Sequence, residues 1–154
     1  MQDLQLLVQE ALDRRRETRM GCFVSNAAAI ELFEFGVEAV PVIEEEVLTF
    51  LGRGNEPTDL DSVLVIYARL VRKFDFTARC LEFLGRLPSI SRVPLLKGIY
   101  VAWLMREPLP GALPPMLLNC VKHIAETGPE GERRVARQIV AIAEVSETAR
   151  CIVL

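Results

Sequence analysis

Apolar residues recur along the chain at the spacing of helices that bury one face. Leu4, Leu7, Val8 and Leu12 follow the i, i+3, i+4 pattern, which predicts an amphipathic helix over residues 3–19. Similar patterns, bounded by Gly, Pro and capping side chains, predict further helices. These cover residues 25–35, 38–51, 59–74, 75–87, 91–106, 114–127 and 130–145. The chain is therefore expected to be all-α.

One stretch could be mistaken for a strand. Val63-Leu64-Val65-Ile66-Tyr67 consists of residues that favour strands. The apolar pattern continues through Phe74, however, and this length favours a buried helix. No strand is expected elsewhere in the chain.

A six-residue phrase occurs twice. Leu48-Thr49-Phe50-Leu51-Gly52-Arg53 recurs 33 positions later as Leu81-Glu82-Phe83-Leu84-Gly85-Arg86, and each copy ends an apolar stretch with Gly and a cation. A helix end that recurs at this interval is typical of stacked helical hairpins. The prediction is one domain over residues 1–154, with hairpins at 25–51, 59–87 and 91–127 and capping helices at 3–19 and 130–145.

The hinges between helices resemble those of a known family. In Phe35-Gly36-Val37-Glu38-Ala39-Val40-Pro41-Val42-Ile43 a Gly separates two helices and a Pro opens the second, which resembles the hinge of HEAT-like repeats. Gly111-Ala112-Leu113-Pro114-Pro115-Met116 echoes it, whereas Lys73-Phe74-Asp75 lacks both residues. The resemblance to the HEAT/armadillo family covers about 100 residues. It implies a short right-handed superhelix of about three antiparallel hairpins, an α-solenoid; an irregular helical bundle is the alternative.

Family members are most often scaffolds or adaptors, so the resemblance implies a non-catalytic module that binds another protein. In HEAT-type hairpins the second helix of each pair usually lines the concave side. Aligning the two copied phrases places Glu46 opposite Arg79 and Thr49 opposite Glu82. The candidate partner-binding residues are Glu46, Arg79, Glu82, Lys122 and His123.

Little in the sequence supports catalysis or a cofactor. His123 is the only histidine, so a histidine-based metal centre is not expected. The carboxylates of Glu44-Glu45-Glu46 point about 100° apart on a helix and do not converge on one site. No catalytic residue, metal or cofactor is assigned. The alternative is an enzyme or chromophore lyase-like protein on the same scaffold, which would use carboxylates with Cys120 or His123.

Charge and composition restrict the partners. Hydrophobic residues make up 51% of the chain, and the formal net charge is −3. Nucleic acid requires a strong positive field, and the arginine clusters at 14–19 and 133–137 are offset by acids, so no nucleic-acid partner is expected. The most apolar stretch, Val93 to Met105, contains Lys97 and is too short to span a bilayer. No transmembrane segment is predicted.

The cysteines and the two ends of the chain bear on localisation. Cys22, Cys80, Cys120 and Cys151 are scattered without paired spacing, which is typical of a reducing compartment. Polar residues interrupt any N-terminal signal segment, so a cytoplasmic protein is expected. The final Cys151-Ile152-Val153-Leu154 (CIVL) matches a prenylation box. A third hypothesis is therefore a membrane-peripheral protein anchored at Cys151, although no polybasic run precedes it.

Overall fold

The computed structural model describes residues 3–13, 18–20, 23–25, 27–105 and 111–153; at 18–20, 23–25, 58 and 147–153 it describes the backbone alone. The helices are α1 (Leu4–Leu12), α2 (Ala27–Phe35), α3 (Ala39–Gly52), α4 (Asp61–Phe74), α5 (Thr77–Arg86), α6 (Val93–Ile99), α7 (Pro115–Thr127) and α8 (Glu130–Val153). Two 3-10 turns, η2 (Gly36–Glu38) and η3 (Pro57–Leu60), precede α3 and α4. A π-helix, η4 (Tyr100–Leu104), continues α6. The fold is thus helical, as the pattern predicts.

The N-terminal helix is shorter than expected, and a small hairpin follows it. Helix α1 ends at Leu12 rather than near residue 19. Asp13 caps this end, and its backbone N–H donates to the Glu10 carbonyl. The strands β1 (Thr18–Met20) and β2 (Phe23–Ser25) then pair antiparallel, with Thr18 opposite Ser25. The expectation of no strand is wrong at this point. The apolar stripe stops at Leu12, and a helix without a face to bury gains little from packing.

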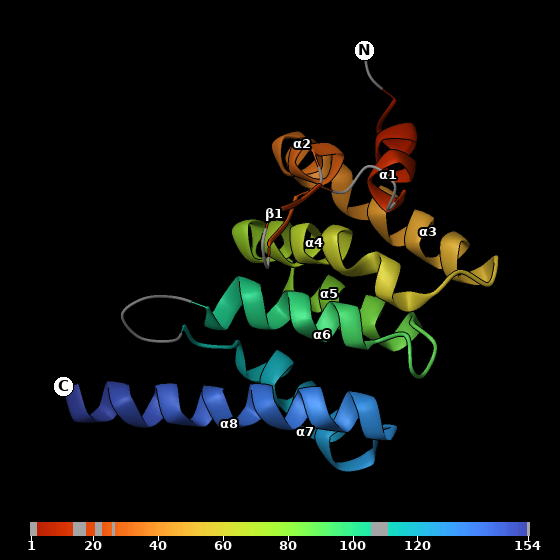
Figure 1. The fold of residues 1–154 in the computed structure, drawn as a ribbon. Helices are drawn as coiled ribbons and strands as arrows, with labels where there is room; N and C mark the ends of the chain where they lie inside the picture. The colour runs from red at the N-terminus through yellow and green to blue at the C-terminus, as the bar shows by residue number, and fades with distance from the viewer. Residues whose placement is uncertain (1–2, 14–17, 21–22, 26, 106–110, 154) are drawn as a thin grey trace.

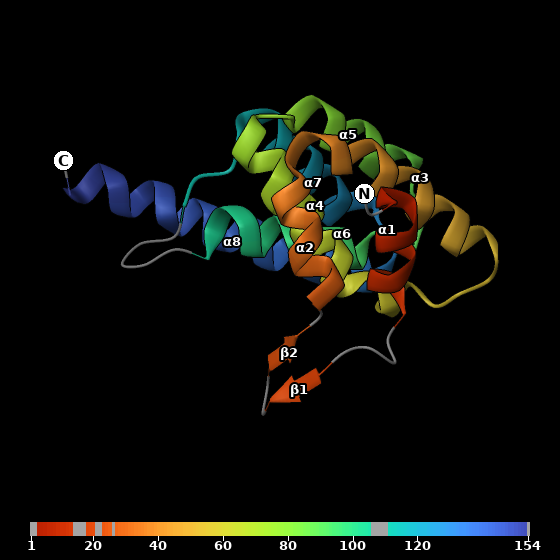
Figure 2. The ribbon, with the colours of Figure 1, turned by 90° about the horizontal axis from the view of Figure 1, so that it is seen from above.

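The helices lie in two rows that run from the N-terminal to the C-terminal end of the molecule (Figures 1 and 2). In one row α2 contacts α4, α4 contacts α6, and α6 contacts α8. In the other row α5 contacts α7, and two ion pairs join α3 to α5. Helix α1 covers α2 and α3 at the N-terminal end. Each helix therefore leans mainly on helices close to it in sequence order.

The pairing of the last helices differs from the predicted hairpin at 91–127. Helices α2 and α3 contact each other, and so do α4 and α5, as the first two predicted hairpins require. The third hairpin would pair α6 with α7, but α6 packs chiefly against α4, and α7 packs along α8. Only Gly128 and Pro129 separate α7 from α8, which forces the two helices into an antiparallel pair. Helix α8 also continues beyond the predicted residue 145 to Val153.

Helix α4 forms the centre of the core, and the predicted buried helix over Val63–Tyr67 is confirmed. Val63, Leu64, Tyr67 and Ala68 have no solvent exposure. Helix α6 crosses α4 closely at Gly98, where a Cβ atom would lie 2.6 Å from the Leu64 carbonyl oxygen. Only a residue without a side chain fits this crossing, which explains a glycine within an apolar helix.

The helix ends explain the repeated phrase and the hinges. Gly52 is the last residue of α3, and Gly85 lies in the last turn of α5, so both copies of the phrase end helices. At the first hinge Gly36 takes φ +71°, the left-handed region that glycine adopts readily. At the second hinge Asp75 takes φ 57° and closes α4 at its C-terminus. Asp75 stands here in place of the missing glycine, since Asp tolerates this conformation.

One buried carboxylate ties the loop before α6 to α8. Glu132 is 1% exposed, and its Oε1 accepts the backbone N–H of Ile90 at 2.6 Å and of Arg92 at 3.3 Å. Its Oε2 lies 3.8 Å from Arg92 Nη1. Ile90 has φ 72°, an unfavourable backbone conformation for a β-branched residue. The contacts to Glu132 therefore hold a strained turn in place.

Candidate functional site

Glu46, the first of the predicted partner-binding residues, faces α1 and lines a cavity of about 460 Å³ together with Gln9 and Arg53. It is 9% exposed, and its carboxylate accepts hydrogen bonds from Gln5 Nε2 at 2.7 Å and Gln9 Nε2 at 3.3 Å. Both donors belong to α1, so Glu46 joins α3 to the N-terminal helix. Each of its carboxylate oxygens therefore accepts a hydrogen bond from within the molecule.

Arg79 is also engaged within the fold. Its Nη2 lies 2.7 Å from Glu44 Oε1, and its Nε donates to the same carboxylate. The Tyr67 hydroxyl donates to Glu44 Oε2 at 2.5 Å. Burial is the main cause that raises the pKa of Tyr67, with its hydrogen bond to Glu44 second, so the phenol stays neutral. This cluster joins α3, α4 and α5. The three neighbouring glutamates contact different helices: Glu44 contacts α4 and α5, Glu45 contacts α5, and Glu46 contacts α1.

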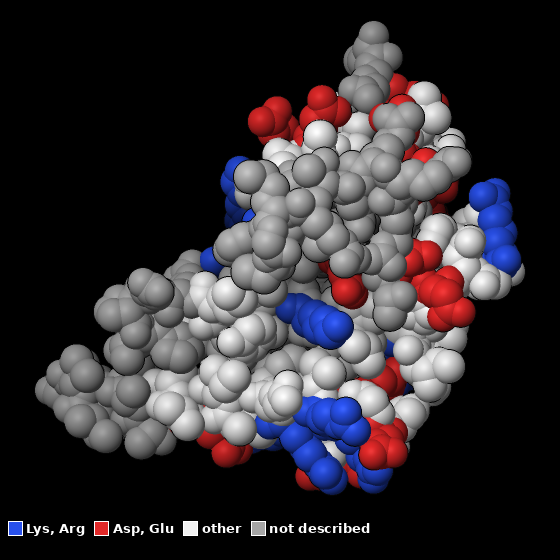
Figure 3. Space-filling view, viewed as in Figure 1, with Lys and Arg blue, Asp and Glu red and all other residues white. Residues whose placement is uncertain are grey.

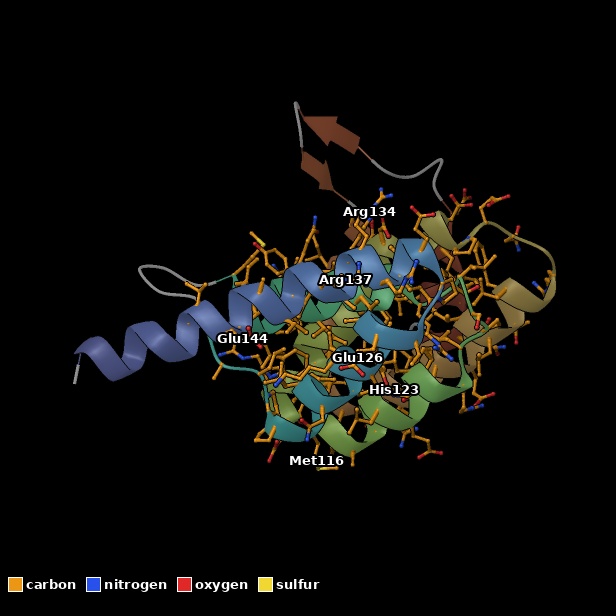
Figure 4. All side chains as sticks on the ribbon, turned by 90° about the horizontal axis from the view of Figure 1, so that it is seen from below. Met116, His123, Glu126, Arg134, Arg137 and Glu144 are labelled. Atoms are coloured by element: carbon orange, nitrogen blue, oxygen red, sulfur yellow. The ribbon has the colours of Figure 1, made fainter. Side chains whose placement is uncertain are left out.

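The other three predicted residues lie on the surface of the α3–α5–α7 row. Glu82 on α5 and Lys122 and His123 on α7 are exposed. Figure 4 shows Glu126 of α7 between His123 of the same helix and Arg137 of α8. The cavity between these two helices, about 480 Å³, is lined by the cations Lys122 and Arg137 and the anions Glu126 and Glu144. The charges balance, so this surface has no strong preference for the sign of a ligand's charge.

The described thiols are not activated nucleophiles. Burial raises the pKa of Cys80 to about 12 and is also the main cause that raises the pKa of Cys120. A reactive cysteine requires a lowered pKa. Among the residues whose side chains are described, no group of three potential metal ligands occurs. Cys22 and residues 14–17 lie outside the described residues, and the structure describes Cys151 through its backbone in α8 only.

A different surface combines charge with apolar lining. We call it the basic groove: a cavity of about 530 Å³ lined by Phe33 of α2, Arg69, Arg72 and Lys73 of α4, Val101 and Ala102 of η4, and Met105. It lies on the α2–α4–α6–α8 row, and α4 contacts both α2 and η4 beside it. Three segments that are distant in sequence thus form its walls.

The three cations of the basic groove share one stripe of α4. Their spacing of i, i+3 and i+4 places Arg69, Arg72 and Lys73 on the same helix face. Lys73 Nζ lies 5.0 Å from the centre of the Phe33 ring and 5.4 Å from that of Phe74. Within the described part of the chain, none of the three cations forms an ion pair.

Five cations elsewhere in the described structure have acidic partners, whereas Lys122 and Arg137 form no ion pair with a described residue. The five pairs are Arg79–Glu44, Arg86–Glu45, Arg92–Glu132, Lys97–Asp61 and Arg134–Glu130. Arg72 and Lys73 lie in the last turn of α4, where their positive charges interact favourably with the negative end of the helix dipole. Arg69 stands a turn earlier and gains less from it. The basic groove therefore gathers three cations without a described acidic partner on one stripe of α4, in a chain of net charge −3.

The apolar lining of the basic groove is partly open to solvent. Met105 is 59% exposed, and Phe33 and Val101 are half-buried. Methionine adapts its shape to different partners, and π-helices such as η4 often occur at functional sites. Sequence reasoning missed this groove because its walls come from residues 33, 69–73 and 101–105. The one local signal was the stripe Arg69-x-x-Arg72-Lys73 on an otherwise apolar helix.

In the part of the chain that the structure describes, no helix combines the length and the apolar character needed to cross a bilayer. Comparison of the chain with protein-family models, with curated proteins and with solved structures found no match. The fold and the basic groove are therefore the features that bear on function.

Proposed function

We propose that this chain is a short HEAT-like α-solenoid that acts as a non-catalytic adaptor and binds another protein. The two rows of helices support the solenoid, because each row advances through contacts between successive repeats. A bundle around a single centre would bring the first and last helices together. Here α1 contacts α2, α3 and α4, whereas α8 packs against α6, η4 and α7. The free thiol of Cys80 fits a cytoplasmic location.

The observation that carries the binding proposal is the basic groove. It is a concave, half-apolar surface whose three cations have no acidic partner among the described residues. Repulsion between like charges on one stripe costs a few tenths of a kcal/mol per pair, which opposes the gain of Arg72 and Lys73 from the helix dipole. A partner that supplies negative charge and apolar surface would offset this cost. The described part offers no activated thiol and no metal-ligand group, which favours binding over catalysis.

The test is affinity capture from a lysate of the source, followed by mass spectrometry, with two matched double variants. Arg69→Glu/Arg72→Glu reverses charge in the basic groove, and Lys122→Glu/His123→Glu changes two of the sequence-predicted partner-binding residues on α7, so the pair compares the two candidate surfaces. All four side chains lack ion pairs in the described structure, so both variants are expected to fold, which circular dichroism checks. We expect a specific protein to be lost by the groove variant and retained by the α7 variant.

Two results would contradict the proposal. If both variants retained the same specific protein as the wild type, the basic groove would not be the binding surface. If the purified chain carried a stoichiometric metal or chromophore and captured no protein, the adaptor function itself would be wrong.

A further inference from the structure

We infer that the basic groove recognises an acidic amphipathic segment of its protein partner, with carboxylates on Arg69 and Arg72 and an apolar side chain against Phe33 and Met105. This inference rests on the proposed function and specifies the chemistry of the ligand. Each of its elements follows from the lining of the groove.

The carboxylates follow from the type and position of the cations. Arg69 is exposed and Arg72 half-buried, and neither forms an ion pair with a described residue. A guanidinium binds a carboxylate through two parallel hydrogen bonds, which favours arginine at sites for acidic side chains. Because the two arginines are one turn apart on α4, acids one turn apart on a partner helix match their spacing. Lys73 is held over the Phe33 ring and adds positive charge rather than a directed contact.

The apolar anchor follows from the opposite wall. Val101, Ala102 and Met105 come from η4 and the residue after it, and Phe33 comes from α2. A free phosphate or a small carboxylate would leave this wall in contact with water. An amphipathic helix places apolar and acidic residues on adjacent parts of one face, which suits a groove with one apolar wall and one basic wall.

Other anionic ligands fit less well. Nucleic acid requires extended positive charge and aromatic rings free for stacking, but the Phe33 ring already lies under Lys73. Helix α2, one wall of the groove, carries the exposed acids Glu31 and Glu34. On the face shown in Figure 3, acidic side chains also lie over the N-terminal helices. A long polyanion would meet this negative charge, and a flat bilayer cannot enter a concave groove; a short acidic helix avoids both problems.

The experiment uses fluorescein-labelled helical peptides and fluorescence anisotropy. The reference peptide carries Leu and pairs of Glu one turn apart on one face. One control peptide has Gln for each Glu, a second has Ala for Leu, and a third has Lys for Glu. The proteins are the wild-type chain, Arg69→Glu/Arg72→Glu, Met105→Ala and the matched surface control Met116→Ala, a methionine on α7 of equal exposure, 60% against 59% for Met105.

We expect the wild type to bind the reference peptide at least tenfold more tightly than the Gln or Ala peptide, with affinity falling as salt rises. The charge-reversed variant should lose at least tenfold for the acidic peptide and should gain affinity for the Lys peptide. Met105→Ala should weaken binding severalfold, and Met116→Ala should leave it unchanged. The swapped charge preference is decisive, because a misfolded variant would bind neither peptide.

The inference is overturned if the acidic peptide binds the wild type and the charge-reversed variant equally, or binds neither. It is also overturned if only phosphatidylserine vesicles or single-stranded RNA bind in a manner that requires Arg69 and Arg72. Its failure can be distinguished from failure of the proposed function. If lysate capture depends on the groove while every acidic peptide fails, the adaptor function stands and the ligand chemistry is wrong. If capture ignores the groove, the proposed binding surface is wrong as well.

Discussion

The crossing of α4 and α6 gives the sharpest prediction about the fold, because replacing Gly98 with Ala should disrupt it. An added Cβ would lie 2.6 Å from the Leu64 carbonyl oxygen and 3.1 Å from the Leu64 carbonyl carbon. Both atoms belong to the backbone, so they cannot rotate away. Since carbon and oxygen approach one another to roughly 3.4 Å without strain, the helices would have to separate by about 0.8 Å.

The size of the effect follows from two opposing terms. A gap of about 0.5–1 Å removes a quarter to a half of the dispersion energy at the affected contacts, and overpacking a core typically costs about 1–3 kcal/mol. Alanine in place of glycine within a helix gains roughly 0.5–1 kcal/mol. The steric cost exceeds this gain, and we expect Gly98→Ala to lower the free energy of unfolding by about 1–2 kcal/mol.

The assay is urea unfolding followed by circular dichroism, with Gly85→Ala as the matched control. Gly85 lies in α5, and a Cβ there would meet nothing within 4 Å. We expect Gly85→Ala to be neutral or to stabilise by up to about 1 kcal/mol. If Gly98→Ala were as stable as the wild type or more so, α4 and α6 would not cross as closely as described, and the row of stacked helices would be in doubt.

Three further predictions concern buried polar groups and backbone strain. Ile90→Gly should raise the free energy of unfolding by about 1 kcal/mol in thermal unfolding, because glycine tolerates φ 72°; a loss of stability would show that this turn is not strained. Arg79→Ala should lower the free energy of unfolding by about 2–3 kcal/mol in urea, because it removes a charged partner from the buried Glu44 carboxylate; a change below about 0.5 kcal/mol would mean that water replaces the guanidinium without cost. The free energy of unfolding should fall as pH rises from about 9 towards 12. Burial raises the pKa of the Cys80 thiol to about 12 in the fold, whereas the unfolded chain keeps the ordinary value of 9.0. Over this range the unfolded chain therefore binds fewer protons than the folded chain, and rising pH favours unfolding. Cys80→Ala should make this decline shallower in denaturant titrations at several pH values, and an unchanged slope would count against the shift.

The sequence predicted the helical elements because their signals are local. The apolar stripe of α4, the Gly36 hinge and the two Gly-Arg helix ends depend on residues within a few turns of one another. The end of α1 is less predictable, because the apolar stripe stops at Leu12 and the polar residues that follow can continue a helix or leave it. The repeat length predicts that α7 pairs with α6. The connection of only two residues between α7 and α8 makes these two helices pair instead.

The site was harder to predict because it depends on contacts between distant segments. Glu46 and Arg79 look like unpaired charges on their helices, but α1 donates hydrogen bonds to Glu46, and Arg79 forms an ion pair with the buried Glu44. These contacts join residues that are distant in sequence, so the local sequence does not predict them. The basic groove requires α2, α4 and η4 to meet, which no repeat alignment shows. All five predicted residues stay predictions for partner contact, and four of them, Arg79, Glu82, Lys122 and His123, are exposed.

The central claim is that a protein partner binds in the basic groove, and methyl NMR of the chain labelled at its methionine methyl groups tests it most directly. Met105 lines the groove, whereas the equally exposed Met116 lies on α7 and serves as an internal control. On addition of the captured partner, we expect the Met105 signal to shift or broaden while the Met116 signal stays in place. A shift of Met116 with Met105 unchanged, or no change in either signal despite demonstrated binding, would contradict the account.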